Sequence, residues 1–176
     1  MTLEAFLTMV RTSSQFSHLY HFTDVNNLSS IRSRGLLSTA ELRRLQLLSG
    51  VVTGGDMNSL NSDIQTGTDN YVCLCLTKNH PMSFRAAERG VNPVYLSINP
   101  EIINLPGVMV TNAASNQIGV VKQPLDVGLD ELHLDSIYKW VDWTKHPEVY
   151  EQRKLAEKYE ILVPKQIAVP YIVGGL

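Results

Sequence analysis

The stretch LYHFTDVNNLSSIRSRGLLS, residues 19–38, passes directly from a strand pattern into a helix pattern. Residues 18–23 predict a strand, and residues 25–34 predict a helix whose apolar positions recur at helical spacing. Gly35 follows the last turn of that helix and is its expected C-cap. The strand contains a histidine, His21, where an aliphatic side chain would be easier to bury. This exception marks the strand as a candidate binding surface.

The predicted strand presents two different faces, because successive side chains of a strand alternate. Tyr20 and Phe22 share the face that we expect to pack in the core. His21 and Thr23 share the other face, where a ring nitrogen and a hydroxyl lie about 7 Å apart along the strand. This spacing suits two polar points of one extended ligand, such as a ribose and a neighbouring group. The alternative is a core histidine that is hydrogen-bonded to the backbone, with Thr23 ending the strand.

The remaining chain mixes helices and strands without a regular βαβ alternation, which favours an α+β fold over a doubly wound sheet. A length of 176 residues suits a single domain, residues 1–176, with a sizeable core. We expect helices over residues 2–12, 39–48, 82–89, 129–140 and 147–158, and strands over residues 71–77, 94–98, 108–110 and within YEILVPKQIAVPYIV, residues 159–173.

Residues 49–70 differ in composition from the rest of the chain. They are rich in Gly, Asn, Ser, Thr and Asp and lack the periodicity of a helix or a strand. We predict a long loop without regular structure, and such loops usually act as lids or binding loops. The segment contains no arginine or lysine, so its side chains offer hydrogen bonds and no positive charge.

Composition and charge exclude several classes of protein. The net charge is -2, which excludes a strongly basic surface that holds duplex DNA nonspecifically. No apolar run reaches the length of about 18 residues that suggests a membrane-spanning helix, so we expect no membrane contact. The first residues also lack the basic start and long apolar stretch of a secretory signal.

The cysteines and histidines do not follow a metal-binding pattern. Cys73 and Cys75 lie on one face of a predicted strand, where they are poorly placed to bond each other. We expect buried, reduced thiols in a cytoplasmic protein. His18 and His21 would point to opposite faces of a strand, and no other histidine has neighbours at zinc-ligand spacing. We therefore expect no metal.

Glu160 is the second polar residue at an unexpected position. It lies at the start of the predicted strand in YEILVP, residues 159–164. A carboxylate in a strand is costly to bury unless it faces water or a partner. The alternatives are a charge at a strand edge, or a functional role for Glu157, which lies in a charged helical run and is more easily solvated.

Four blocks of the sequence resemble, in order, the DarT-type ADP-ribosyltransferase toxins. They are YHFTDVNNLSSIRSRGLLS (residues 20–38), TKNHPMSF (77–84), YLSINPEIINLPGVMVT (95–111) and KYEILVPKQIAVPYI (158–172). The resemblance spans nearly the whole chain. It implies an ADP-ribosyltransferase-like fold in which two small β-sheets with flanking helices form a cleft for NAD. It also implies an enzyme that transfers ADP-ribose to a DNA base.

The resemblance implies that Glu160 is the catalytic glutamate. Breaking the bond between nicotinamide and ribose builds positive charge on the sugar, as in glycoside hydrolysis. A fixed carboxylate at the ribose 2′-hydroxyl orients the sugar and stabilises that charge where water is scarce. Replacement by glutamine would keep the size of the side chain and remove its charge.

The resemblance also implies a set of NAD contacts. His21 would contact the adenosine ribose, and Thr23 the adjoining part of NAD. Phe84 would stack on nicotinamide, the alternative being a core aromatic residue on a short helix. The wall of the cleft would be shaped, partly through backbone atoms, by Asn27, Gly35 and Leu36.

Recognition of the acceptor is implied in the segment that precedes the catalytic strand, YKWVDWTKHPEVYEQRKLAEKY, residues 138–159. Trp143 and Tyr150 would stack on a single-stranded or extruded base. Arg153 would meet a phosphate. The alternative is a structural role, in which Trp140 packs in the core and the basic residues are nearly matched by acidic ones.

Three hypotheses for function follow. The first is NAD-dependent ADP-ribosylation of single-stranded DNA by a bacterial toxin or phage-defence effector that a cognate antitoxin opposes. Relatives that modify thymine carry an arginine in the loop after the second helix, whereas residues 49–70 contain none, so a guanine amino group or an RNA target stays open. The second hypothesis keeps the fold and makes RNA or protein the acceptor. The third is a module that binds NAD or nucleic acid without turnover.

Overall fold

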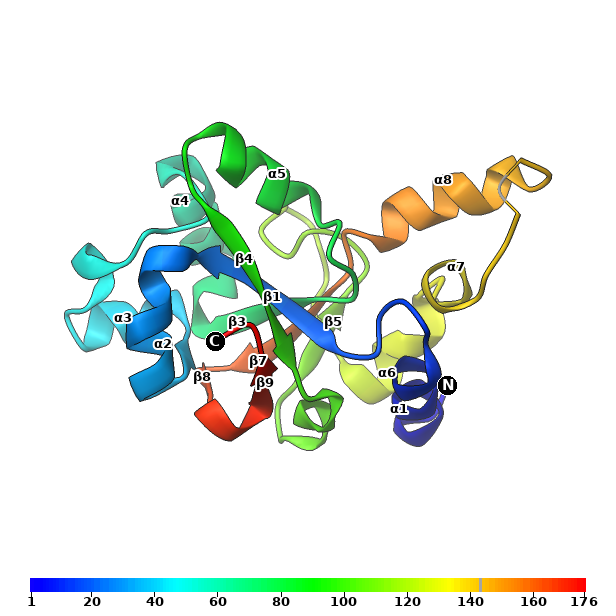
Figure 1. The fold of residues 1–176 in the computed structure, drawn as a ribbon, viewed down its shortest axis with the longest axis horizontal. Coiled ribbons are helices and arrows are strands. Elements are labelled where there is room, and N and C mark those ends of the chain that lie inside the picture. Colours follow the sequence, from blue (N-terminus) through cyan, green and yellow to red (C-terminus); the bar gives the residue numbers. More distant parts are fainter. Residues whose placement is uncertain (143) are drawn as a thin grey trace.

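The computed structural model describes residues 1–142 and 144–176, which form two β-sheets. The larger is a seven-stranded antiparallel sheet of order β6-β5-β7-β3-β1-β4-β9 (Figure 1). Its strands are β1 (Leu19–Asp24), β3 (Tyr71–Cys75), β4 (Pro93–Ile98), β5 (Met109–Thr111), β6 (Gln123–Pro124), β7 (Glu160–Pro164) and β9 (Ile172–Gly174). The smaller sheet pairs β2 (Leu36–Leu37) with β8 (Gln166–Ile167). The α+β prediction is confirmed, and the two expected sheets are unequal in size.

Helices lie in most of the connections between the strands, and α1 precedes the first strand. Figure 1 shows α2 and α3 beyond the end of β1, with α1 and α6 at its opposite end. The α-helices are α1 (Leu3–Thr12), α2 (Leu28–Arg34), α3 (Thr39–Arg44), α4 (Met57–Thr66), α5 (Pro81–Glu88), α6 (Leu125–Gly128), α7 (Asp135–Tyr138) and α8 (Pro147–Ala156). The 3-10 helices are η1 (Val25–Asn27), η2 (Leu48–Gly50), η3 (Thr68–Asn70), η4 (Pro100–Asn104), η5 (Leu129–Glu131) and η6 (Val169–Tyr171).

Strand β1 lies inside the larger sheet, between β3 and β4. Along its whole length it pairs with β4. Tyr20 is buried in the core, as its position in the alternation predicts. Phe22 packs only partly against the core, and it also lines a cavity at this part of the sheet. The two faces of β1 are therefore less distinct than strict alternation suggests.

Gly35 ends α2 and allows the start of β2 to approach β8 within the smaller sheet. Its φ of +78° lies in the left-handed region that glycine adopts without strain. A Cβ atom at this position would collide with the carbonyl oxygen of Ile167 in β8. The predicted C-cap is confirmed, and the same glycine brings Leu36 into register with Ile167.

Residues 49–70 contain regular structure, so the prediction of a structureless loop is wrong. They include α4 and η3. The Asp56 carboxylate accepts from the Ser59 N–H at 2.9 Å and caps α4, and Gly67 ends the helix at φ +70°. None of the residues of α4 is buried, and its three apolar residues, Met57, Leu60 and Ile64, lie among seven polar ones, so the helical spacing is easily overlooked in the sequence.

The segment before β7 also differs from the prediction. Trp140 is 84 % exposed, so its expected place in the core is wrong. A tryptophan at this degree of exposure contributes little to core packing. Trp143, which was predicted to stack on a base, lies outside the described residues.

Candidate active site

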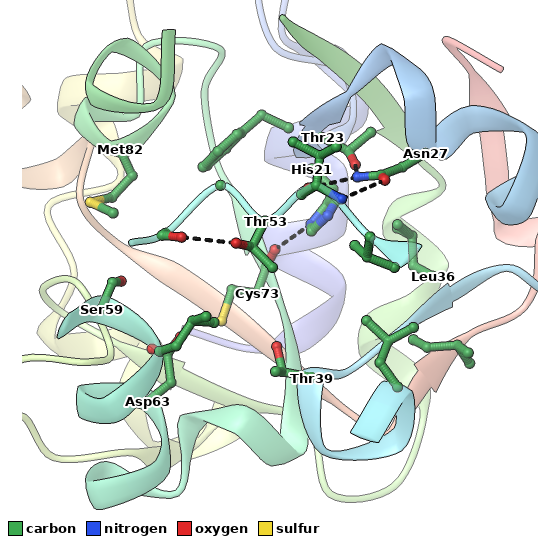
Figure 2. Close-up of a pocket in the computed structure, with 18 of the residues that line it drawn as sticks. His21, Thr23, Asn27, Leu36, Thr39, Thr53, Ser59, Asp63, Cys73 and Met82 are labelled. Atoms are coloured by element: carbon green, nitrogen blue, oxygen red, sulfur yellow. Dashed lines mark hydrogen bonds between the residues drawn. The ribbon is translucent and has the colours of Figure 1, made fainter. Parts of the chain in front are cut away.

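One cavity, with a volume of about 230 Å³, lies between the two sheets (Figure 2). The larger sheet contributes side chains from β1, β3 and β7, and the smaller sheet contributes β2. The far wall consists of residues 51–55, α4 and residues 114–116. Among the described residues that line the cavity, there is no lysine or arginine. Arg89 reaches this wall from outside, because its guanidinium donates to the carbonyl oxygen of Gly54.

His21 lines the cavity in a defined tautomer. Its Nδ1 lies 3.0 Å from the carbonyl oxygen of Cys73, which can only accept, so Nδ1 carries the proton. Burial lowers the pKa of His21 and keeps the ring neutral at pH 7. In the neutral ring, Nε2 is an acceptor. The side chain can therefore accept a hydrogen bond from a ligand hydroxyl.

Asn27 joins β1 to the far wall of the cavity. Its side-chain amide donates to Thr23 Oγ1 at 3.1 Å and to the carbonyl oxygen of Val52 at 2.8 Å. Its own oxygen accepts from the Val52 N–H at 3.0 Å. These bonds are visible around the Asn27 label in Figure 2. Thr23, Asn27, Gly35 and Leu36 all line the cavity, as the resemblance implies.

Glu160 opens β7 and faces the same cavity, although it is only 8 % exposed. It pairs with Cys75 on one side and with Thr111 on the other. Its Oε2 accepts from the backbone N–H of Ser115 at 2.8 Å. Ser115 is itself anchored, because its carbonyl oxygen accepts from Thr68 Oγ1 at 2.9 Å. The carboxylate is therefore fixed in a largely dry wall, as stabilisation of a cationic sugar requires.

Asp63 is a second carboxylate at the cavity, and the sequence patterns did not identify it. It projects from α4 (Figure 2), a helix in the segment 49–70 that the composition predicts to be a loop. Burial, followed by the nearby charge of Glu160, raises the pKa of Asp63 to about 6. Asp63 is therefore ionised at pH 7 but holds its proton more tightly than an ordinary aspartate.

Phe84 is not among the residues that line the cavity, so the structure does not support its stacking on nicotinamide there, and this contact stays a prediction. The side chain is 59 % exposed. Met82 lines the cavity from the same helix, α5. Helical geometry explains the difference, because residues two apart point in nearly opposite directions around the helix axis.

Arg153 lies in a buried position that does not favour its predicted phosphate contact, which stays a prediction. It is 5 % exposed, and its Nη1 donates to the carbonyl oxygens of Ser136 at 3.0 Å and Ile137 at 3.1 Å. Its Nε pairs with Glu157 at 3.0 Å. Tyr150, on the same helix, is exposed and has the Lys154 ammonium 4.3 Å from its ring centre. Its base contact stays a prediction.

Within residues 1–142 and 144–176, no three or more His, Cys, Asp or Glu side chains are grouped so that they could hold a metal ion. No helix in the same described part of the chain is long and apolar enough to cross a bilayer.

A model of the family "ssDNA thymidine ADP-ribosyltransferase, DarT" matches residues 20–174. Among solved structures, the chain resembles Thermosipho africanus DarTG in complex with ADP-ribose, at 17% identity and a TM-score of 0.65. That match covers 88% of this chain and 42% of the DarTG chain, so this chain spans less than half of that protein. No protein with a curated description matches the chain at a significant level.

Two structures of Thermus sp. 2.9 DarT are also similar. The complex with ADP-ribosylated ssDNA has 14% identity and a TM-score of 0.62, and the match covers 92% of this chain and 82% of that one. The complex with NAD+ has 16% identity and a TM-score of 0.55, with coverage of 88% and 78%. At these identities the likeness establishes the fold.

Proposed function

This chain belongs to the DarT family of ssDNA thymidine ADP-ribosyltransferases, and we propose that it transfers ADP-ribose from NAD to a base of single-stranded DNA. The observation that carries the proposal is the placement of Glu160, His21 and Thr23 around one cavity between the two sheets. Solved relatives in complex with NAD+ and with ADP-ribosylated ssDNA support the same substrates. NAD is the co-substrate of the proposed reaction.

The proposed role of the β1 residues is to bind NAD. The neutral His21 ring offers Nε2 as an acceptor to a hydroxyl of the adenosine ribose. Thr23 and Asn27 are tied to each other and to Val52, so this wall is ordered before NAD arrives. Pre-ordering reduces the entropy lost when a flexible ligand such as a dinucleotide binds. Gly35 and Leu36 complete the wall where the sheets meet.

The proposed catalytic carboxylate is Glu160. The bond between ribose C1′ and the nicotinamide nitrogen breaks, its electron pair leaves with neutral nicotinamide, and positive charge develops on the sugar. Glu160 accepts from the ribose 2′-hydroxyl and stabilises that charge. Because Ser115 already holds Oε2, the carboxylate does not need to reorganise during the reaction.

Asp63 is the proposed proton acceptor for the incoming base. A nitrogen of the base bonds to ribose C1′, and its proton passes to the Asp63 carboxylate. A pKa of about 6 suits a general base near neutral pH better than the pKa of an ordinary aspartate does. The cavity lining described contains no cation that could assist instead. Residues 49–70 lack the arginine that thymine-modifying relatives carry in this segment. The resemblance therefore does not identify the modified base, and the experiment below does.

A mass-spectrometric assay tests the proposed function. Protein and NAD are offered to four single-stranded DNA oligonucleotides that each contain one target base in a common background. Single-stranded RNA and a carrier protein serve as parallel acceptors. Addition of a single ADP-ribose to DNA supports the proposal, and fragmentation identifies the base. Addition to RNA or protein alone would show that DNA is not the acceptor. Transfer to RNA or protein is the second candidate function, because the described lining of the cavity contains no lysine or arginine. NAD binding without turnover would favour a binding module.

The proposed biological role is that of a bacterial toxin or phage-defence effector that acts in the cytoplasm, where NAD is abundant. Modification of DNA bases blocks their use as a template, so such an enzyme needs control. The family resemblance suggests a cognate antitoxin that removes the modification or binds the enzyme. Expression in bacteria tests this role, because the wild-type chain should stop growth and the Glu160→Gln variant should not.

A further inference from the structure

His80 lies directly behind the catalytic carboxylate and was not identified from the sequence. It precedes α5 and is 1 % exposed. Its Nε2 lies 3.4 Å from Oε1 of Glu160, the oxygen that Ser115 does not hold. Within the described residues, this Nε2 is buried without a hydrogen-bond partner. Such groups are rare in folded proteins, and one beside a catalytic carboxylate suggests a function.

The other contacts of the ring fix its tautomer and its plane. His80 Nδ1 accepts from the Met82 N–H at 3.3 Å, so in the neutral ring the proton is on Nε2 and faces Glu160. Phe22 stacks against the ring, with 6.4 Å between ring centres and 23° between planes. Burial lowers the pKa of His80 more strongly than Glu160 and Glu157 raise it, so the ring is neutral at pH 7.

We propose that His80 is a positioning residue that donates its Nε2–H to Oε1 of Glu160 when NAD fills the cavity. This inference rests on the proposed function of Glu160. In the absence of ligand, catalytic hydrogen bonds are often long and shorten in the substrate complex. Ser115 and His80 then hold one carboxylate oxygen each. Because every carboxylate oxygen has two acceptor sites, both oxygens keep one site for the ribose.

A neutral donor has a specific advantage in this place. A protonated histidine would pair with Glu160 and reduce the negative charge that stabilises the sugar cation. A neutral ring with its proton on Nε2 orients the carboxylate without neutralising it. Burial of His80 against Phe22 maintains that neutral state.

Two substitutions at His80 separate positioning from packing. In His80→Asn, the side-chain oxygen replaces Nδ1 as the acceptor for Met82, and no donor reaches Glu160. In His80→Gln, the amide nitrogen occupies the place of Nε2 and restores the donor. We expect kcat for ADP-ribosyl transfer to fall about 10- to 100-fold in His80→Asn, with KM for NAD within about twofold of wild type. His80→Gln should recover most of kcat.

The opposite order would overturn the inference, because a Gln variant weaker than the Asn variant would show that His80 acts only through its cap on α5. Equal activity of His80→Asn and wild type would overturn it as well. An inactive wild type would refute the proposed function instead.

A ¹⁵N-detected imidazole spectrum of the wild-type protein tests the role of His80 even if the wild type is inactive. We expect the proton on Nε2, and a downfield proton shift when carba-NAD is added. A proton on Nδ1, or no shift with carba-NAD bound, would contradict the positioning role.

Discussion

The backbone N–H of Ser115 donates to Oε2 of Glu160 at 2.8 Å and so connects the segment after β5 to the proposed catalytic carboxylate. Residues on both sides of Ser115 reinforce this connection. Thr111 Oγ1 donates to the carbonyl oxygen of Ala113, and Asn116 donates to Ser59 of α4. Glu160 is therefore positioned by a chain segment that is also bonded to the wall carrying Asp63.

Thr68→Val tests this connection, because it removes the hydroxyl that anchors the Ser115 carbonyl at 2.9 Å and changes little else in shape. We expect a loss of about 1 kcal/mol in the free energy of unfolding. We also expect kcat for ADP-ribosyl transfer to fall several-fold. Urea unfolding and steady-state kinetics measure the two effects. Thr12→Val is the matched control, because its hydroxyl bonds only within α1. A Thr68 variant with unchanged kcat would show that Ser115 is held by other contacts.

Asn27→Ala should weaken the NAD-binding wall. The variant loses both bonds to Val52 and the bond to Thr23, so we expect a loss of about 1–3 kcal/mol in the free energy of unfolding. We also expect weaker binding of carba-NAD, measured by calorimetry. Asn61→Ala on the exposed part of α4 is the control. Unchanged affinity in a folded Asn27 variant would argue against a role for residues 51–55 in NAD binding.

Met82→Ala and Phe84→Ala form a matched pair on α5. Met82 lines the cavity and Phe84 does not, so only Met82→Ala should weaken carba-NAD binding. We expect a change of about 1 kcal/mol for Met82→Ala, which is several-fold in Kd. The reverse result would return Phe84 to the nicotinamide site that the sequence resemblance implies.

Asp63→Asn should stabilise the protein in a pH-dependent way. The folded-state pKa of Asp63 is raised from 3.8 to about 6, so its ionisation opposes folding. The penalty is absent below about pH 4, where both states are protonated, and it is complete above about pH 6. Because the carboxyl group keeps contact with solvent, we expect a gain of roughly 1 kcal/mol at pH 7.5.

Urea unfolding of wild type and Asp63→Asn at pH 4 and pH 7.5 measures this difference. Equal gains at the two pH values would contradict the assigned pKa shift. The same variant should transfer ADP-ribose more slowly, because it cannot accept the proton of the base. A more stable protein with lower activity would be typical of a functional residue that is held in an unfavourable environment.

The sequence identified those site residues that interrupt an apolar pattern. His21 and Glu160 are polar residues within strands, and the resemblance to a known family implies a role for each. Both line the cavity. Gly35 was identifiable as well, because a helix C-cap and a close approach of two backbone segments both favour glycine.

Other site residues depend on contacts that sequence spacing does not encode. Asp63 lies on a largely polar helix, and Ser115 acts through its backbone. His80 is separated from Glu160 by many residues and meets it only because α5 begins beside β7. Arg153 shows the converse case, since a basic residue in a charged run is buried against carbonyl oxygens.

The most direct test of the central claim is ADP-ribosyl transfer by Glu160→Gln. Glutamine keeps the size of the side chain and removes the charge that stabilises the sugar cation. We expect transfer to single-stranded DNA to fall at least about 10³-fold, while carba-NAD still binds. Transfer by Glu160→Gln within about tenfold of the wild-type rate would contradict the assignment of Glu160 as the catalytic carboxylate.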